Sequence, residues 1–173
     1  IIDMAGIQIT VPTGGIYIRG YNFDLSQLVS TEAAATLFYS LASGNVLMFD
    51  LGITMSGAGS QVYNLKSNTG FDAIEVQRIN YNNCTSLGTL DNFRQGLETG
   101  TGRFGGTPSL TLKGAWLGGF AIATSIVRSL TAGTYSVFTA GAGFVMQSRF
   151  RSDMNVDLPA SASFVDFSVT NFP

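Results

Sequence analysis

The chain has 173 residues, a formal net charge of −2 at pH 7 and 12% charged residues, with one cysteine and no histidine. Without histidine it lacks the imidazole on which many acid–base, nucleophilic and zinc sites depend, and a single cysteine forms no disulfide within the chain. It has no basic stripe of the kind that binds nucleic acid and no run of about 20 apolar residues that would span a membrane. We therefore expect no cofactor, no metal, no nucleic acid and no membrane insertion.

The N-terminal part predicts strands and one helix. Ile7–Val11 and Ile16–Arg19 alternate apolar and polar residues around a Pro-Thr-Gly-Gly turn, which is typical of half-buried strands. Ser30–Leu41 predicts a short helix, because a serine N-cap and a first-turn glutamate precede three alanines. A strand over Thr36–Tyr39 is the alternative.

From residue 46 onward, short apolar segments alternate with turns of small and polar residues, which predicts an all-β fold. Neither Asn-Gly nor Asp-Gly, the usual hairpin turns, occurs in the chain. We therefore favour a parallel β-helix (a solenoid), with a jelly roll or β-sandwich as the alternative. Residues 1–59 are expected to form an N-terminal joint or capping region with strands and one short helix, and residues 60–173 a β-rich shaft.

Three local motifs are interpreted as structural. Gly100–Gly105 fits the pattern G-x-G-x-x-G, but a Gly-Thr-Pro sequence and an apolar strand segment follow it, so no helix begins there to meet a dinucleotide. Asn80–Asn83 is interpreted as an Asn-rich bend at a corner of the solenoid. Cys84 is interpreted as a small buried apolar residue.

Paired carboxylates are the one enzymatic chemistry left open, because glycosidases need only two of them. Asp72 and Glu75 have an odd spacing that would place them on opposite faces of a strand. Asp91 with Glu98, or Asp50 with Asp72 on neighbouring turns, remain open as pairs. We assign no catalytic residue and expect the chain not to be an enzyme; a polysaccharide depolymerase is the runner-up.

Four residues are candidates for contact with a ligand: Arg94, Arg103, Trp116 and Tyr81. Arginine, asparagine and aromatic side chains recognise sugars by bidentate hydrogen bonds and stacking. The alternative for the arginines is an ion-pair network that clamps a loop against a neighbouring chain. Glycines around Trp116 would leave its ring accessible, and the alternative there is a core or interface anchor.

Two thirds of the chain resembles structural proteins of phages that infect Bacteroidota-like bacteria, proteins described as tail-fibre, spike or other virion appendage components. The similar segments are Thr69–Ala73, Ser86–Gly88, Arg94–Gly100, Arg103–Pro108, Thr124–Arg128 and Leu158–Ala162. The resemblance implies a homotrimeric virion protein with a β-helical or β-rich shaft. It brings no catalytic motif and does not cover the residues before Ser60.

These observations together predict an elongated, multimeric virion appendage protein whose role is mechanical and adhesive. With so few charged residues, a single chain would expose apolar surface. Copies of the chain and other virion proteins would cover that surface. Contact with a bacterial surface polysaccharide would draw its strength from multivalency. A jelly-roll capsid or decoration protein is the third alternative.

Overall fold

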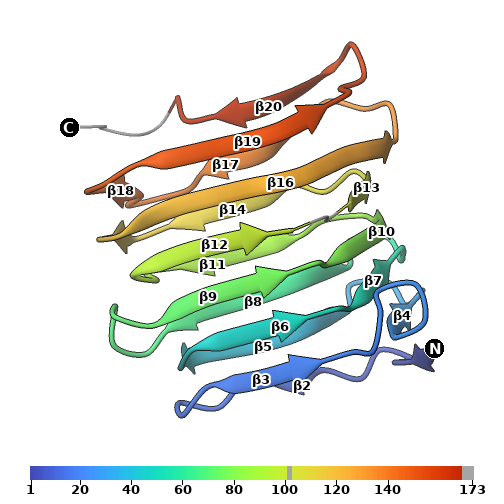
Figure 1. The fold of residues 1–173 in the computed structure, drawn as a ribbon, viewed down its shortest axis with the longest axis horizontal. Helices are drawn as coiled ribbons and strands as arrows, with labels where there is room; N and C mark the ends of the chain where they lie inside the picture. Colours follow the sequence, from blue (N-terminus) through green and yellow to red (C-terminus); the bar gives the residue numbers. More distant parts are fainter. Residues whose placement is uncertain (101–102, 169–173) are drawn as a thin grey trace.

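The computed structural model describes residues 1–100 and 103–168, and all of their regular structure is β-strand (Figure 1). The all-β prediction is confirmed, because every regular element of the described residues is a strand. The described part of the chain has no helix with the length and apolar character that crossing a membrane requires.

The strands lie on three faces that the chain visits in turn. The first face contains β3 (Ile16–Arg19), β6 (Val46–Phe49), β9 (Ala73–Gln77) and β12 (Gln95–Thr99). The second contains β1 (Ile2–Asp3), β4 (Gln27–Ser30), β7 (Gly52–Met55), β10 (Asn80–Cys84) and β13 (Arg103–Gly106). The third contains β2 (Ile9–Thr10), β5 (Thr36–Ser43), β8 (Gln61–Ser67), β11 (Gly88–Asp91), β14 (Leu110–Lys113), β17 (Tyr135–Ala140) and β20 (Ala162–Asp166).

Two long strands join the first face to the second near the C-terminal end. They are β16 (Gly119–Leu130), which pairs with both β12 and β13, and β19 (Phe150–Val156), which lies beside β16. A separate two-stranded ladder joins β15 (Ala115–Trp116) to β18 (Val145–Met146). The first and second faces therefore form one continuous sheet around a corner.

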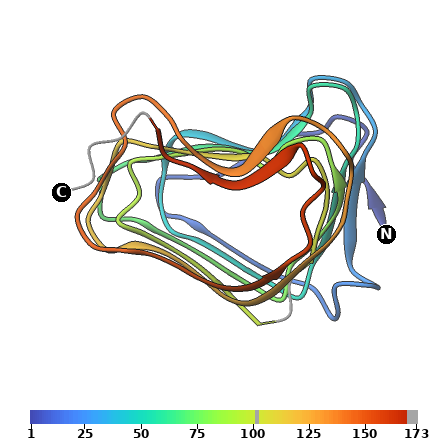
Figure 2. The same cartoon turned by 90° about the horizontal axis from the view of Figure 1, so that it is seen from above.

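All strand pairs among the described residues are parallel, and the chain makes about six turns of a β-solenoid. Viewed from the end, successive turns superimpose around one flattened cross-section (Figure 2). Jelly rolls and β-sandwiches are built from antiparallel sheets, so that alternative for the fold, and with it a jelly-roll capsid protein, is wrong. The preferred prediction, a parallel β-helix, is confirmed.

The turns differ in length, which conceals the repeat in the sequence. On the first face Ile16 pairs with Val46, 30 residues later, whereas Ile74 pairs with Gly96, only 22 residues later. On this face the paired segments keep their register, so the differences in length lie in the rest of each turn. A solenoid tolerates such variation since each turn needs only to contact its neighbours.

The helix predicted over Ser30–Leu41 is wrong. Its first residue ends β4, a turn with Ala34 in the left-handed region (φ 55°) follows, and β5 begins at Thr36. Parallel pairing of β5 with β2 on one side and β8 on the other outweighs the helix propensity of the alanines. The alternative interpretation of this segment as a strand is confirmed.

Strand pairing runs across the expected boundary between residues 59 and 60. Strands β5, β6 and β7 pair with β8, β9 and β10 respectively, on all three faces. The division into a joint and a shaft stays a prediction, and the ladders show that the two parts share one stack of turns.

The interior of the solenoid is filled by large apolar side chains in register from turn to turn. Rings of Phe38, Tyr63, Tyr81 and Phe104 follow one another at centroid distances of 5.1 to 6.4 Å. Nearer the C-terminal end, a cluster of phenylalanines continues the stack: Phe120, Phe138, Phe150, Phe164 and Phe167. The apolar core therefore extends along the whole axis.

One corner of the solenoid repeats in three successive turns. Asp50, Arg78 and Gly100 follow the last residues of β6, β9 and β12, and all three have positive φ. The backbone N–H of Asp50 donates to the carbonyl of Gln77, and that of Arg78 donates to the carbonyl of Thr99. Asp50 accepts two hydrogen bonds from the Arg78 guanidinium, which join neighbouring corners.

Candidate functional site

An outward-facing groove lies on the second face between β10 and β13. Its volume is about 160 Å³. It is lined by Asn80, Tyr81, Asn82, Asn83, Arg103, Phe104, Gly105 and Gly106. We call this the second-face groove. It brings together two of the four residues predicted from the sequence to contact a ligand.

A β-bulge shapes this groove. Tyr81 pairs with Phe104 and Cys84 pairs with Gly106, so β10 has one residue more than β13 across the same interval. The surplus falls at Asn82 and Asn83, and Asn83 adopts a left-handed conformation (φ 47°). Bulges re-aim side chains and are common beside functional sites. The Asn-rich segment is thus a bulged strand, and its interpretation as a corner bend is wrong.

Tyr81 is wrong as a surface contact, because its side chain points into the solenoid and is only 2% exposed. Its hydroxyl lies 2.9 Å from the hydroxyl of Tyr63, with which it shares a hydrogen bond. Burial raises the pKa values of both phenols. Tyr81 therefore forms part of the inner wall of the second-face groove and offers no free ring to a ligand.

Trp116 is also wrong as an exposed contact, because it is fully buried. Its ring packs between those of Phe93 and Phe120, and its indole N–H donates a 2.8 Å hydrogen bond to the carbonyl of Lys113. Its alternative role as a core anchor is confirmed. The neighbouring glycine at position 114 adopts a positive φ at a corner and does not uncover the ring.

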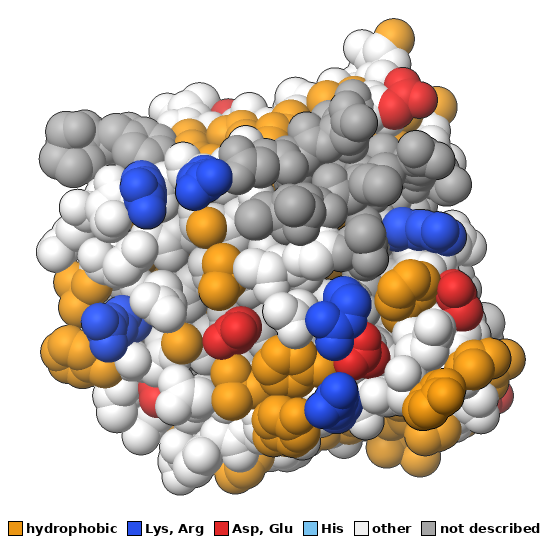
Figure 3. Space-filling view, in the orientation of Figure 1, with side chains coloured by type: hydrophobic (Ala, Val, Ile, Leu, Met, Phe, Trp, Pro, Cys, Tyr) orange, Lys and Arg blue, Asp and Glu red, His pale blue; other side chains and the backbone are white. Residues whose placement is uncertain are grey.

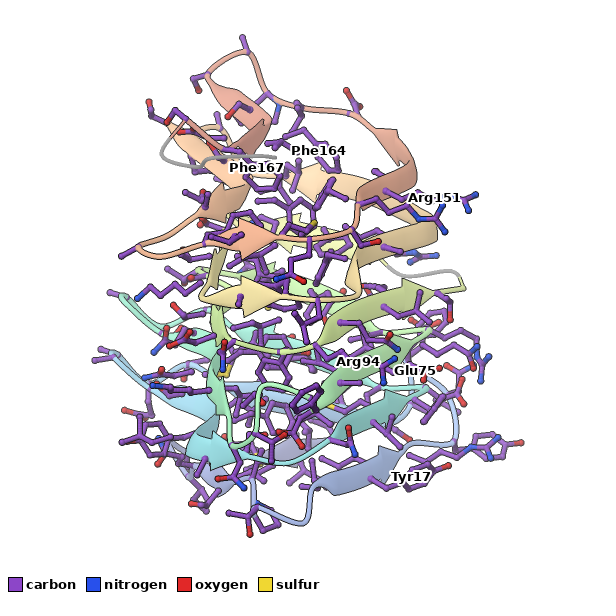
Figure 4. All side chains as sticks on the ribbon, turned by 90° about the vertical axis from the view of Figure 1, so that its left-hand side faces the viewer. Tyr17, Glu75, Arg94, Arg151, Phe164 and Phe167 are labelled. Carbon is purple, nitrogen blue, oxygen red and sulfur yellow. The ribbon has the colours of Figure 1, made fainter. Side chains whose placement is uncertain are left out.

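Arg103 and Arg94 are both exposed and lie on different faces. Arg103 begins β13 and lines the second-face groove, whereas Arg94 precedes β12 on the first face. Figure 4 places Arg94 with Tyr17, Glu75 and Arg151 along one outer edge of the solenoid. Among the described residues the ion pairs that form are those of Asp50, so neither Arg94 nor Arg103 has a carboxylate partner there. Contact through Arg94 stays a prediction.

The candidate carboxylate pairs do not converge. Asp50 follows β6 and Asp72 precedes the parallel strand β9, so they lie at opposite ends of the first face. Asp91 lies on β11 with its side chain half-buried, whereas Glu98 is buried inside the solenoid. Glu75 lies on the outer side of β9, whereas Glu98 lies on the inner side of β12. None of these pairs has the geometry of a glycosidase.

Asp50 and Asp72 have structural roles instead. Hydrogen bonds from the Arg78 guanidinium hold the pKa of Asp50 below its ordinary value. Burial opposes the ionisation of Asp72, but hydrogen bonds from Ser67 and Thr69 outweigh it and lower the pKa of that carboxyl. Each aspartate therefore ties down the loop or corner in which it lies.

The cysteine and the glycine-rich motif also have the structural character expected from the sequence. Cys84 is buried, its thiol donates to the carbonyl of Ile53, and burial raises its pKa to about 12, as expected for an inert apolar position. The glycine-rich motif at 100–105 leads into β13, although residues 101 and 102 lie outside the described part. No cluster of three or more acidic or cysteine residues that would hold a metal occurs among the described residues.

No protein-family model, curated protein or solved structure matches this chain. The second-face groove therefore stands as the candidate site on its geometry. Two of its residues, Asn80 and Asn82, were not predicted as contacts from the sequence. The alternation of Asn80, Tyr81 and Asn82 is a strand signal that would have placed both amides on the side of β10 opposite the Tyr81 ring.

Proposed function

We propose that the chain is a rigid structural module of a virion appendage, a tail fibre or spike, that contributes to attachment at a host surface. The observation that carries this proposal is the unbroken parallel ladder of the third face, which runs from β2 to β20. Repeating backbone hydrogen bonds and a filled apolar interior stiffen such a shaft without disulfides. The same regular stacking suits a part that transmits force.

The distribution of exposed apolar side chains supports assembly into a larger particle. Among the residues whose side chains the structure describes, eleven large hydrophobic ones are exposed, and six of these lie within the first 25 positions: Ile1, Ile2, Ile7, Tyr17, Tyr21 and Leu25. Figure 3 shows hydrophobic side chains gathered over the N-terminal turns at the lower end of the molecule. Concentrated apolar surface marks an interaction site. We propose that a homotrimer contact or another virion protein covers it.

Immunolabelling of purified virions tests this function. Antibodies raised against the purified chain are expected to decorate fibre- or spike-shaped appendages in negatively stained particles. A preparation treated with antibody that has been pre-absorbed on the same protein is the control. Labelling confined to the capsid shell, or no labelling of particles that contain the protein by mass spectrometry, would overturn the proposal.

We also propose that the module is not catalytic, because each acidic pair weighed as a catalytic centre is separated in the fold. Incubation with host-surface polysaccharide is therefore expected to release no reducing ends above a heat-denatured control. Sustained release that disappears in Asp72→Ala or Glu98→Ala variants would instead establish a depolymerase.

A further inference from the structure

We propose that copies of this chain stack end to end, so that the C-terminal end of one solenoid continues into the N-terminal end of the next. The inference goes beyond the trimer proposed above, because it concerns a contact along the axis of the solenoid. Figure 1 shows the two ends, with β2 and β3 at the lower one and β19 and β20 at the upper one.

The first turn leaves one edge of every face unpaired. Within the described residues β1 pairs only with β4, β2 only with β5, and β3 only with β6. Each of these strands therefore presents a row of backbone N–H and C=O groups to the end of the solenoid. An extended polypeptide strand matches such a row, because it carries the complementary donors and acceptors at the same spacing.

The apolar core also reaches this end without a covering layer. Four isoleucines form its last layer, and each pairs in register with a buried residue of the next turn. The pairs are Ile2 with Leu28, Ile9 with Phe38, Ile16 with Val46, and Ile18 with Met48. Ile2 is nevertheless 60% exposed, and the other three isoleucines are half-buried. A further turn with apolar inward side chains would bury this layer, as each turn buries the one before it.

The C-terminal end presents the complementary surface. Among the described residues β20 pairs only with β17, and β19 only with β16, so these two strands also have an unpaired edge. Phe150, Phe164 and Phe167 pack against the core at this end but are only half-buried. Figure 4 places Phe164 and Phe167 at the upper end of the solenoid. An aromatic layer at one end can therefore cover the isoleucine layer at the other.

Strand direction and outline match at the two ends. All strand pairs among the described residues are parallel, so β20 of one copy would run in the same direction as β2 of the next on the third face. Because β19 follows β16 across the first and second faces, it would lie over both β3 and β1. Successive turns superimpose in the view along the axis (Figure 2), so the stacked copy meets the same cross-section.

A second copy is therefore the occupant that the N-terminal end fits. Repeat proteins that stay single cover their ends with terminal repeats that have a polar outer face, and the isoleucine layer is the reverse of such a cap. The contact joins two different surfaces of the chain. It does not close on itself, and its repetition gives rods.

The variants Ile18→Lys and Phe164→Lys test the contact, because each places an ammonium group at one end only. In the single chain the lysine can reach water at the open end, so both variants should fold. In a stack the next copy would bury this charge without a partner, which prevents the contact. By sedimentation velocity we expect each purified variant alone to keep one mass. An equimolar mixture should form a species of twice that mass, because it contains one intact pair of ends.

The parent chain and a matched control complete the experiment. The parent chain is expected to form rods of increasing length as its concentration is raised. Tyr17→Lys is the control, because Tyr17 precedes Ile18 on β3 but points outward and is 60% exposed. This variant should stack as the parent chain does.

A mixture that keeps the mass of its components would overturn the proposal and leave the N-terminal end to a polypeptide other than this chain. Stacking by either variant alone, or its loss in Tyr17→Lys, would also overturn it. Near-ultraviolet circular dichroism separates loss of contact from loss of folding. If Phe164→Lys does not fold, equal masses for Ile18→Lys and the parent chain would still overturn the proposal. The test uses the purified chain, so its result is independent of the immunolabelling of virions.

Discussion

Glu98 is a carboxyl enclosed in an apolar interior. It lies on the inner side of β12 near the Tyr63–Tyr81 hydroxyl pair, and its Oε1 has no hydrogen-bond partner among the described residues. Burial raises its pKa from 4.5 to about 8. The folded chain therefore holds a proton that the unfolded chain releases near pH 4.5, so folding stability falls as pH rises from about 4.5 to about 8 and is level above that.

Glu98→Gln is expected to remove this pH dependence, because an amide of the same shape does not ionise. At pH 8.5 the variant should exceed the parent chain in free energy of unfolding by about 1.4 kcal/mol or more, which corresponds to a shift of at least one pKa unit. Urea denaturation at pH 5, 7 and 8.5 measures the difference. Glu75→Gln, on the outer side of β9, is the control and is expected to change stability little. A constant difference across this pH range would contradict the prediction.

The Asp50 corner gives the opposite dependence on pH. Its two oxygens accept hydrogen bonds of 2.5 and 2.8 Å from Arg78, which lower its pKa and stabilise the folded chain once Asp50 is ionised. Asn tolerates positive φ, so Asp50→Asn removes the charge and keeps the corner. We expect a loss of about 1 kcal/mol at pH 7. The loss should vanish as pH falls through the lowered pKa of Asp50, and denaturation midpoints at pH 2.5 and 7 check this.

At the scale of one strand, β12 depends on the absence of a side chain at Gly96. A Cβ there would overlap the ring of Phe120, which lies in register on β16, and would also approach the ring of Trp116. Gly96→Ala is expected to destabilise the fold by about 1–3 kcal/mol through overpacking. Gly14→Ala, where an added Cβ meets open space, is the control. Adding Phe120→Leu to Gly96→Ala should restore part of the loss; an additive double variant would contradict this account.

The strands also show why local sequence signals succeeded or failed. The alternation at Ile16–Arg19 predicted β3 correctly, because one side of that strand faces the core and the other faces solvent. The segment after Ser30 looked helical because capping and alanine content are local properties. It forms a strand because it pairs with residues 25 positions away; Phe38, for example, pairs with Tyr63. A local sequence pattern does not contain that information.

The fold class of the whole molecule was predictable from the sequence, whereas the number of turns and the path of the strands were less so. Short strands without hairpin dipeptides indicated a parallel solenoid, and that fold is present. The number of turns and the passage of β16 across two faces depend on loop lengths that vary from turn to turn. Trp116 and Tyr81 were misplaced because composition does not tell on which side of a strand a ring lies. Arg103 was chosen with Arg94 because polar groups concentrate in that part of the sequence; the structure places it at the second-face groove, and its contact with a ligand stays a prediction.

Assembly through the N-terminal turns can be tested on the purified chain. A homotrimer is expected to give three times the chain mass of 18.3 kDa by sedimentation equilibrium and an elongated particle by solution scattering. Because exposed apolar residues concentrate in the N-terminal turns, the double variant Ile7→Lys, Tyr21→Lys should dissociate the trimer without unfolding it. Phe71→Lys, a similarly exposed apolar position in the loop before β9, is the control and should stay trimeric. A parent chain that remains a compact monomer at high concentration would remove the assembly, and dissociation by Phe71→Lys alone would move the contact away from the N-terminal turns.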